Sequence, residues 1–444
     1  MESLHKGFDD KTWQVHKFGG TSVADASCLE KAASIIEEQL TFSDNAERQV
    51  PNLAVVVSAM GGKPKVTDLL LSAVRAAANR DDGQVTEKMN FIMKKHHTCL
   101  QNLPLSPSVR QELESVISKD LQDIRDILKT VSLMKWQATR ISELVSGYGE
   151  TWSSQILSAL LSARAADYLG EEIEHRFCYL DARRVITIDE DAIKDGAVCW
   201  DTSLSKMHVA YQEELKKTFG GGTSMNQRLH FIITGFVASN THGVATTLQR
   251  DGSDYSAAIM GRLLESASIQ IWTDVDGVLS ADPRRVPDAY VLPEVSFNEA
   301  MELAYFGAKV IHPRTMQPCI MGDPQIPIYI RNTFNSSFQG SRIFTSSTTH
   351  QDRDRCVCGF ASIEKMAIVN VEGSGMVGVK GVARRLFGTL ESIGVNVVLI
   401  AQASSEHSIT FATTMQEAKA GKEAIEEEFH KEISQVCDPT STFE

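Results

Sequence analysis

A glycine-rich turn near the start of the chain carries the residues best suited to phosphate chemistry. The segment Lys17–Ser22 reads KFGGTS and follows a short apolar run that begins at Trp13. Glycines after a strand let backbone N–H groups approach phosphate oxygens, and the N-terminus of a following helix favours negative charge. The Lys17 ammonium adds a point charge beside Gly19 and Gly20. The pattern predicts an anion-binding turn, although a Gly-Gly turn can also serve packing alone.

The commonest nucleotide-binding signatures are absent. No segment matches the P-loop pattern G-x-x-x-x-G-K-[ST], and the HRD and DFG motifs of protein kinases do not occur. Gly373–Gly378 matches G-x-G-x-x-G, but Ala401–Ala403 stands where a dinucleotide site needs an acidic residue. The glycines of Gly220–Gly222 precede a strand, whereas a phosphate loop follows one, so they are interpreted as a surface insertion. ATP chemistry would need another architecture.

Three more polar clusters stand at predicted strand ends or helix starts. Arg250–Tyr255 reads RDGSDY and opens a predicted helix with Ser253 as its N-cap. Ile271–Gly277 ends a strand in polar residues, and Asp282–Arg284 follows closely. Open α/β sheets bind ligands beyond the carboxyl ends of their strands. Each cluster is weak evidence by itself, but together they predict one phosphate-handling cleft.

Composition narrows the classes of function. The 444 residues are 42% hydrophobic and 23% charged, with a net charge of −13, which disfavours nucleic-acid binding. The 8 cysteines have no metal-ligand spacing, and His96, His97 and His312 are interpreted as structural, so no metal site built from protein ligands is predicted. No apolar stretch is long enough to span a membrane, and Met1–Trp13 has no signal-peptide pattern. We therefore expect a cytoplasmic protein.

The elements that must position these residues alternate between strands and helices. A predicted strand at Trp13–Phe18 precedes a helix at Val23–Leu40, and a second strand at Leu53–Val57 precedes a helix at Thr67–Ala77. This rhythm predicts an α/β domain with a largely parallel sheet and helices on both faces. Residues 81–169 are predicted to be helical. Further strands are expected at 176–180, 229–236, 268–273 and 326–332, and further helices at 253–264 and 297–307.

A polar stretch at Thr345–Arg355 separates this domain from a different pattern. The expected elements there are strands at 366–371, 395–401 and 408–413 and helices at 382–393 and 417–433. A βαββα order is typical of a small α+β module. We predict a catalytic domain at 13–345, a linker at 346–359 and a regulatory domain at 360–444.

Five motifs resemble, in the same order, those of aspartate kinases, which have the amino-acid kinase fold. The motifs are Lys17–Ser22, Val145–Glu150, Arg250–Tyr255, Ile271–Gly277 and Phe306–Pro313. The segments at 370–378 and 400–408 look like an ACT-type regulatory region, and the chain is most similar to the kinase part of bifunctional aspartate kinase–homoserine dehydrogenases. The resemblance implies phosphoryl transfer from ATP, with Mg²⁺, to L-aspartate. The product would be 4-phospho-L-aspartate, in the first step of lysine, threonine and methionine biosynthesis.

The resemblance also implies a role for each matching position. Nucleotide contacts are implied for Lys17, Gly19, Gly20, Thr273, Asp274, Arg284 and Lys309. Aspartate contacts are implied for Thr67, Glu150, Arg250 and Ser253. Asp254 would support the catalytic centre with Lys17, and Gln402 matches a position that contacts an amino-acid effector.

The implied chemistry suits these residue types. A carboxylate with a pKa near 3.9 is already ionised at neutral pH, so no general base is needed. Catalysis then consists of positioning two anions and neutralising charge. Arg250 would grip a carboxylate with two hydrogen bonds, and Glu150 would pair with the ammonium of aspartate.

Two features depart from the family pattern. Leu279 stands where relatives commonly have Tyr, on the adenine side of the nucleotide site. One ACT-like unit is present where the family usually has two, so we expect weak or absent inhibition by threonine or lysine. ACT units usually pair, which implies a homodimer or a higher homo-oligomer.

Two other functions stay open. The first is a non-catalytic amino-acid sensor, and the second is a kinase for glutamate or acetylglutamate. The presence of Lys17, Glu150, Arg250 and Asp254 favours the active aspartate kinase over both.

Overall fold

The computed structural model describes residues 12–41, 50–135, 139–168, 173–190, 197–221, 224, 226–249, 252–306, 311–345, 357–373, 376, 378–402 and 408–437. The chain divides into two compact units, Met1–Ala361 and Ser362–Glu444. Residues 346–356 of the predicted linker lie outside the described part. None of the helices described is long and apolar enough to cross a membrane.

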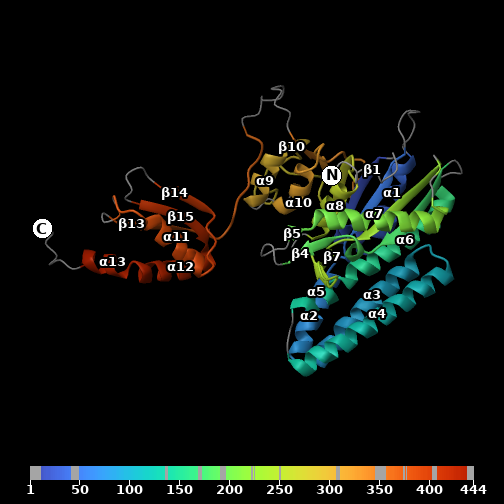
Figure 1. Ribbon diagram of the computed structural model, residues 1–444, viewed down its shortest axis with the longest axis horizontal. Coiled ribbons are helices and arrows are strands. Elements are labelled where there is room, and N and C mark those ends of the chain that lie inside the picture. Colours follow the sequence, from blue (N-terminus) through green and yellow to red (C-terminus); the bar gives the residue numbers. More distant parts are fainter. Residues whose placement is uncertain are drawn as a thin grey trace. The chain divides into compact units, whose positions relative to one another are not determined.

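An eight-stranded sheet forms the centre of the first unit (Figure 1). Its order is β10-β12-β11-β9-β1-β2-β6-β3. The strands are β1 (Trp13–Phe18), β2 (Asn52–Val57), β3 (Glu174–Leu180), β6 (Gln227–Thr234), β9 (Ser268–Thr273), β10 (Glu294–Ser296), β11 (Ile328–Asn332) and β12 (Ser341–Phe344). Every neighbouring pair is parallel except β11 and β12. The predicted α/β fold with a largely parallel sheet is confirmed.

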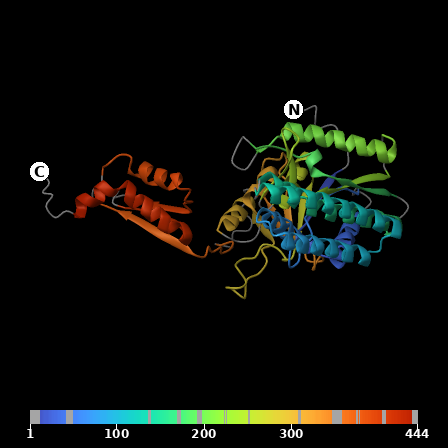
Figure 2. The ribbon, with the colours of Figure 1, turned by 90° about the horizontal axis from the view of Figure 1, so that it is seen from below.

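Helices cover both faces of this sheet, because side chains alternate between two cores along each strand. Phe18 and Val57 enter one core, whereas Val15 and Val56 enter the other. The first core is covered by α1 (Ala26–Thr41), α2 (Val66–Ala78), α3 (Asp82–Asn102), α4 (Pro107–Met134) and α6 (Tyr148–Tyr168). The second is covered by α7 (Trp200–Phe219), α8 (Gly252–Leu263), α9 (Phe297–Tyr305) and α10 (Pro313–Ile320). Helices α3 and α4 run side by side in the view of Figure 1 and in that of Figure 2.

A second, four-stranded sheet was not expected from the sequence. Its order is β5-β4-β7-β8. The strands are β4 (Thr187–Asp189), β5 (Ala197–Val198), β7 (Val237–Asn240) and β8 (Ala245–Thr247). Strands of two to four residues are too short to show an alternating pattern. The helix α5 (Thr139–Ser146) contacts this sheet through a hydrogen bond between Thr246 and Glu143.

The second unit contains a three-stranded antiparallel sheet in the order β13-β15-β14. Its elements are β13 (Met366–Glu372), α11 (Val382–Ser392), β14 (Leu399–Gln402), β15 (Ser408–Thr414), α12 (Met415–Glu428) and α13 (His430–Cys437). Leu386, Leu390 and Phe411 form the centre of its small core. The βαββα order is therefore confirmed, but the strand predicted to start at Val395 begins only at Leu399.

Two of the histidines interpreted as structural have local partners. His96 is buried, with its ring edge-on to Trp152 at 5.0 Å, and its Nδ1 bonds the Ile92 carbonyl at 2.8 Å. His312 caps α10, where its Nδ1 accepts the Arg314 N–H at 3.2 Å.

We expect the burial of His96 to make the stability of the protein depend on pH. Burial lowers its pKa to about 4, below the value of about 6.5 in an unfolded chain. The unfolded chain therefore binds the extra proton, so this contribution to stability is full above pH 6.5 and is lost as the pH falls toward 4. His96→Gln should cost stability at pH 7, and its deficit relative to the wild type should shrink by about 2 kcal/mol at pH 5. Urea denaturation at both pH values measures this, and a deficit that does not change with pH would contradict it.

Candidate active site

The carboxyl ends of four parallel strands meet at one edge of the large sheet. In the strand register, Phe18 on β1 lies between Val57 on β2 and Trp272 on β9, and Val57 lies opposite Thr234 on β6. The residues that follow these strands therefore lie along the same edge. This is where an open α/β sheet binds ligands.

The glycine turn after β1 packs tightly against the loop after β2. The Gly61 N–H donates to the Gly20 carbonyl at 2.8 Å, and a Cβ on Gly61 would overlap that carbonyl. Gly235, after β6, is held against Ser253, because a Cβ on Gly235 would lie 2.8 Å from the Ser253 Cβ. Close approach of neighbouring backbone at Gly61 and of a side chain at Gly235 explains why glycine is needed at these positions.

Not every amide of the turn faces a ligand. The Gly19 N–H donates to the Trp272 carbonyl at 3.1 Å and so joins β1 to β9. A Cβ on Gly19 would lie 3.4 Å from the Lys17 Nζ, which places the ammonium beside the turn. The short helix η2 (Gly20–Val23) follows, and α1 begins only at Ala26, three residues later than the predicted start at Val23.

Lys17 and Asp254 form the central ion pair of this edge. The Lys17 Nζ lies 2.6 Å from the Asp254 Oδ1, and the two side chains are 10% and 20% exposed. Lys17 comes from β1 and Asp254 from the first turn of α8, 237 positions apart in sequence (254 − 17). The tertiary fold thus fixes a largely buried ammonium at the turn.

The prediction that Ser253 is the N-cap of α8 is wrong. The helix begins at Gly252, so Ser253 lies inside its first turn and is not the N-cap. The capping position falls at residue 251, which is outside the described residues together with Arg250. Ser253 still lies at the carboxyl edge of the sheet because it packs against Gly235, which follows β6.

Glu150 is a buried carboxyl group in the first turn of α6. The residue is 4% exposed, and among the atoms described its Oε2 has no hydrogen-bond partner. Burial raises its pKa to about 8, against the opposing effect of the Ala59 and Glu150 backbone N–H groups. Ala59 also lies against Gly149, where a Cβ would come within 2.7 Å of the Ala59 Cβ. A buried acceptor without a donor costs free energy, so Glu150 is suited to receive a cationic ligand.

Thr67 lies close to this carboxyl group in the fold. It is half-buried in the first turn of α2, beside Val66. A Cβ on Gly149 would lie 3.2 Å from the Val66 Cγ1, so the starts of α2 and α6 adjoin. The structure therefore brings Thr67 and Glu150 to neighbouring helix starts.

The end of β9 provides a second group of polar residues. The Thr273 hydroxyl donates to the Asp274 Oδ1 at 3.2 Å. Asp276, which the sequence placed at this strand end without a role of its own, accepts hydrogen bonds from Asn332 at 2.8 Å and Asn335 at 3.1 Å. These bonds tie the loop after β9 to the end of β11. The repeated acidic residues of TDVDG were the available signal for Asp276.

The other residues predicted for the site have different surroundings. Arg284 is exposed, and its guanidinium is bonded to both carboxylate oxygens of Asp282. Leu279 is half-buried and bridges to Val291. Lys309 lies outside the described residues. Gln402 is exposed on β14, in the other unit.

Lys95 is a supporting residue that the sequence did not reveal. Its Nζ donates from α3 to the Gly61 carbonyl, and burial lowers the pKa of this ammonium. From α6, the Ser153 hydroxyl donates to the Ser58 carbonyl at 2.7 Å. Both bonds hold the loop after β2. A lysine in a long polar helix carries no sequence signal for such a contact.

Two protein-family models and several known proteins match this chain. A family model for the amino acid kinase family matches residues 12–332, and one for the ACT domain matches residues 369–429. The chain is 37% identical over 423 residues to a bifunctional aspartokinase/homoserine dehydrogenase 2, chloroplastic, of Arabidopsis thaliana. This alignment covers 95% of the chain and 42% of the relative.

A shorter relative is matched over most of its length. The chain is 32% identical over 417 residues to aspartokinase 2, chloroplastic, of Arabidopsis thaliana, covering 93% of the chain and 68% of the relative. Among solved structures, E. coli aspartokinase III in complex with lysine and aspartate superposes with a TM-score of 0.66 at 24% identity, over 90% of this chain and 78% of that one. The same enzyme in complex with aspartate and ADP superposes with a TM-score of 0.61 at 21% identity, over 94% and 99%. At these identities the structural likeness shows the fold.

Proposed function

Because this chain belongs to the amino acid kinase family and, within it, to the aspartokinases, we propose that it transfers the γ-phosphoryl group of ATP to the β-carboxylate of L-aspartate. The products are ADP and 4-phospho-L-aspartate, the first intermediate of lysine, threonine and methionine biosynthesis. The observation that carries the proposal is the Lys17–Asp254 ion pair beside the glycine turn, at the carboxyl edge of the sheet.

The phosphates of ATP would lie along the glycine turn. The Lys17 ammonium stands beside Gly19 and is held by Asp254, so it needs no reorganisation to neutralise charge that develops during transfer. Gly20 lets the chain approach the phosphates closely. Thr273 and Asp274, and with them Arg284 and Lys309, are the proposed further nucleotide contacts.

Aspartate would lie between the starts of α2, α6 and α8. Its side-chain carboxylate is ionised at neutral pH and attacks the γ-phosphorus directly, so the site needs no general base. Glu150 would receive the substrate ammonium with its unpartnered oxygen, while Thr67, Ser253 and Arg250 would hold the carboxylates. The rate then depends on how well the two anions are aligned.

The residues present fit a magnesium ion that arrives with the nucleotide. No group of three or more His, Cys, Asp and Glu side chains in the described ranges could hold a metal ion alone. Kinase sites typically bind Mg²⁺ through one or two carboxylates together with substrate phosphates, and Asp274 is an exposed carboxylate at the end of β9. Bound Mg²⁺ would neutralise phosphate charge.

The direct test is an ADP-release assay with aspartate and glutamate as alternative acceptors. We expect turnover that depends on both Mg²⁺ and aspartate, with little turnover of glutamate. Turnover indifferent to aspartate would overturn the proposal. Preference for glutamate would identify another amino-acid kinase, and the absence of any turnover would favour an amino-acid sensor.

Aspartate binding should depend on pH through Glu150. The carboxyl is neutral below about pH 8 and must ionise to pair with the substrate ammonium, so KM for aspartate should rise as the pH falls. The expected rise steepens toward tenfold per pH unit below pH 8, because one proton is released on binding. Glu150→Gln should raise KM at pH 8 and flatten the profile. Initial rates measured across this range would contradict the assignment if both proteins gave the same pH dependence.

The second unit would mediate self-association, and we propose a homodimer. In β14, at the edge of its sheet, Leu399 and Ile400 are 52% and 55% exposed. An edge strand with apolar side chains is a template for pairing with another copy. Ile400→Lys should convert the dimer to a monomer in light scattering after gel filtration, whereas Met415→Lys, on the exposed start of α12, should not. A wild-type protein that is monomeric at high concentration would refute this.

The ACT unit is also the proposed binding region for an amino-acid effector, near Gln402. E. coli aspartokinase III has been solved with lysine, so lysine and threonine are the effectors to add separately to the assay. We propose that residues 13–345 form the catalytic domain and that residues 360–444 form the regulatory domain. The cytoplasmic location stays a prediction, since several relatives are named as chloroplastic.

A further inference from the structure

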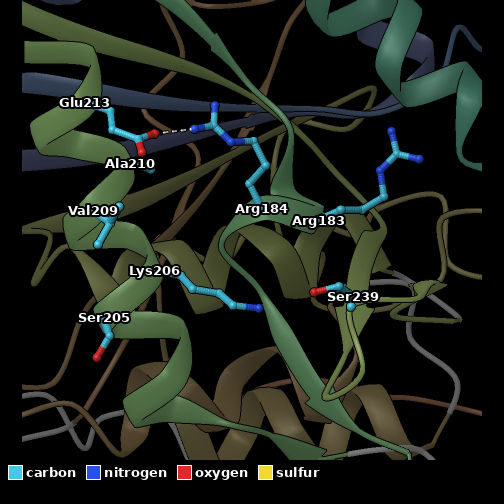
Figure 3. Close-up of a pocket in the computed structure, with 9 residues that line it drawn as sticks. Arg183, Arg184, Ser205, Lys206, Val209, Ala210, Glu213 and Ser239 are labelled. Atoms are coloured by element: carbon cyan, nitrogen blue, oxygen red, sulfur yellow. Dashed lines mark hydrogen bonds and ion pairs between the residues drawn. The ribbon is translucent and has the colours of Figure 1, made fainter.

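A basic pocket lies in the first unit between α7 and the turn after β3. Its volume is about 470 Å³, within the range of small-molecule sites. The residues that line it are Arg183, Arg184, Ser205, Lys206, Val209, Ala210, Glu213, Ser239 and Gly243. In Figure 3, Lys206 extends from α7 toward Ser239, while Arg184 is turned toward Glu213. None of the residues placed in the active site lines this pocket.

The charge of the basic pocket is opposite to that of the chain. Its described lining contains three cationic side chains and one carboxylate, a balance of +2 (3 − 1), whereas the whole chain has a net charge of −13. Asp181 and Glu214, which do not line the pocket, lie within ion-pair distance of Arg183 and Arg184 and offset this excess, so the positive charge offered to a ligand is that of Lys206.

Both arginines of the pocket form ion pairs, whereas Lys206 forms none within the described residues. The Arg183 guanidinium is bonded to both oxygens of Asp181, and the Arg184 Nη2 lies 2.7 Å from the Glu213 Oε2. The Lys206 Nζ donates to the neutral Thr187 hydroxyl at 2.7 Å. Within the described residues, no carboxylate lies within ion-pair distance of it. Lys206 therefore keeps two N–H donors for a ligand.

The fixed donors and the apolar wall together define the class of ligand. Thr187 lies on β4 and holds the Lys206 ammonium in place. The side chain of Val209, 57% exposed, lies one helical turn further along α7 and gives the pocket an apolar surface. Preorganised donors beside a small apolar wall suit an anionic head group on a short carbon skeleton.

We propose that the basic pocket is a second ligand site of the kinase unit, which binds a small organic anion, a phosphate monoester or a dicarboxylate, with Lys206 as its anchoring cation. The site does not depend on the proposed reaction, because it shares no residue with the active site.

Calorimetric titration of the full chain with glycerol 3-phosphate and, separately, with succinate tests the proposal. We expect at least one of them to bind, and the stronger of the two distinguishes a phosphate from a carboxylate site. Lys206→Met should weaken binding by about tenfold or more, as expected for loss of a charged hydrogen bond. Lys216→Met is the matched control, since this exposed lysine of the same helix does not line the pocket.

Two further variants separate loss of binding from loss of folding. Glu213→Gln should tighten binding several-fold, because it removes the one carboxylate of the described lining and leaves Arg184 only the longer 4.0 Å ion pair with Glu214, and misfolding cannot produce that result. Lys17→Ala and Arg250→Ala, which remove a proposed phosphate contact and a proposed carboxylate contact of the active site, should leave the affinity unchanged. The proposal is overturned if neither anion binds, if Lys206→Met binds as tightly as the wild type, or if Lys17→Ala or Arg250→Ala abolishes binding, which would assign the signal to the active site.

Discussion

Lys17→Met should lower kcat by about 10²–10³-fold while leaving the fold intact, as expected when one preorganised charged donor is removed from a reaction centre. The ammonium is largely buried, lies 2.6 Å from Asp254 and stands beside the glycine turn. Water cannot supply an equivalent charge at that position without reorganising during the reaction. KM for aspartate should change much less than kcat, because the lysine acts on the phosphate side. Steady-state kinetics with ATP and aspartate varied in turn measure both constants.

A double-mutant cycle with Asp254→Asn makes this prediction sharper. Lys17 and Asp254 form one ion pair, so the double variant should lose little more activity than Lys17→Met alone. Lys129→Met, an exposed lysine of α4, controls for the change in net charge and should retain full activity. If the losses of the two single variants multiply in the double variant, the residues act independently and the pair is not a unit.

Gly61→Ala should reduce kcat/KM about a hundredfold, although the substitution adds one methyl group. The new Cβ would overlap the Gly20 carbonyl and come within 2.8 Å of the Thr21 backbone nitrogen. The two loops must separate, and a displacement of about 1 Å in a reacting group can cost this much rate. The displaced loop is also the one that Lys95 holds through the Gly61 carbonyl. Kinetics, together with a melting curve, separate misalignment from unfolding.

Gly83→Ala is the matched control for this variant. Its nearest neighbour would be the Asp81 Oδ1 at 3.5 Å, an ordinary contact, and alanine is the better helix former in α3. It should therefore keep full activity. Gly61→Ala with near wild-type kcat/KM would show that the contact between the loops does not position the phosphate turn.

Much of the main sheet could be predicted from the chain alone. The strands β1 and β9 have the predicted bounds, because each short run is followed at once by glycine or by polar residues that end a strand. The second sheet was missed, because β4, β5, β7 and β8 are too short for any periodicity. The N-cap of α8 was wrongly predicted at Ser253, which lies inside the helix, since several polar residues before Ser253 offer equivalent caps.

The sequence by itself determined the kind of chemistry. Its glycine turn, lysine and polar strand ends predicted a cleft that handles phosphate, and the order of its motifs resembled that of aspartate kinases, which implied phosphoryl transfer to a carboxylate. Only the tertiary structure decided which of them meet. It shows that Asp254 holds Lys17, that Gly61 leaves room for Gly20 and that Lys206 faces a cavity, and it buries a Glu150 oxygen that has no partner among the described atoms. These are distances between segments far apart in the chain. Burial, charge pairing and the room for a methyl group are set by such distances, and no local pattern encodes them.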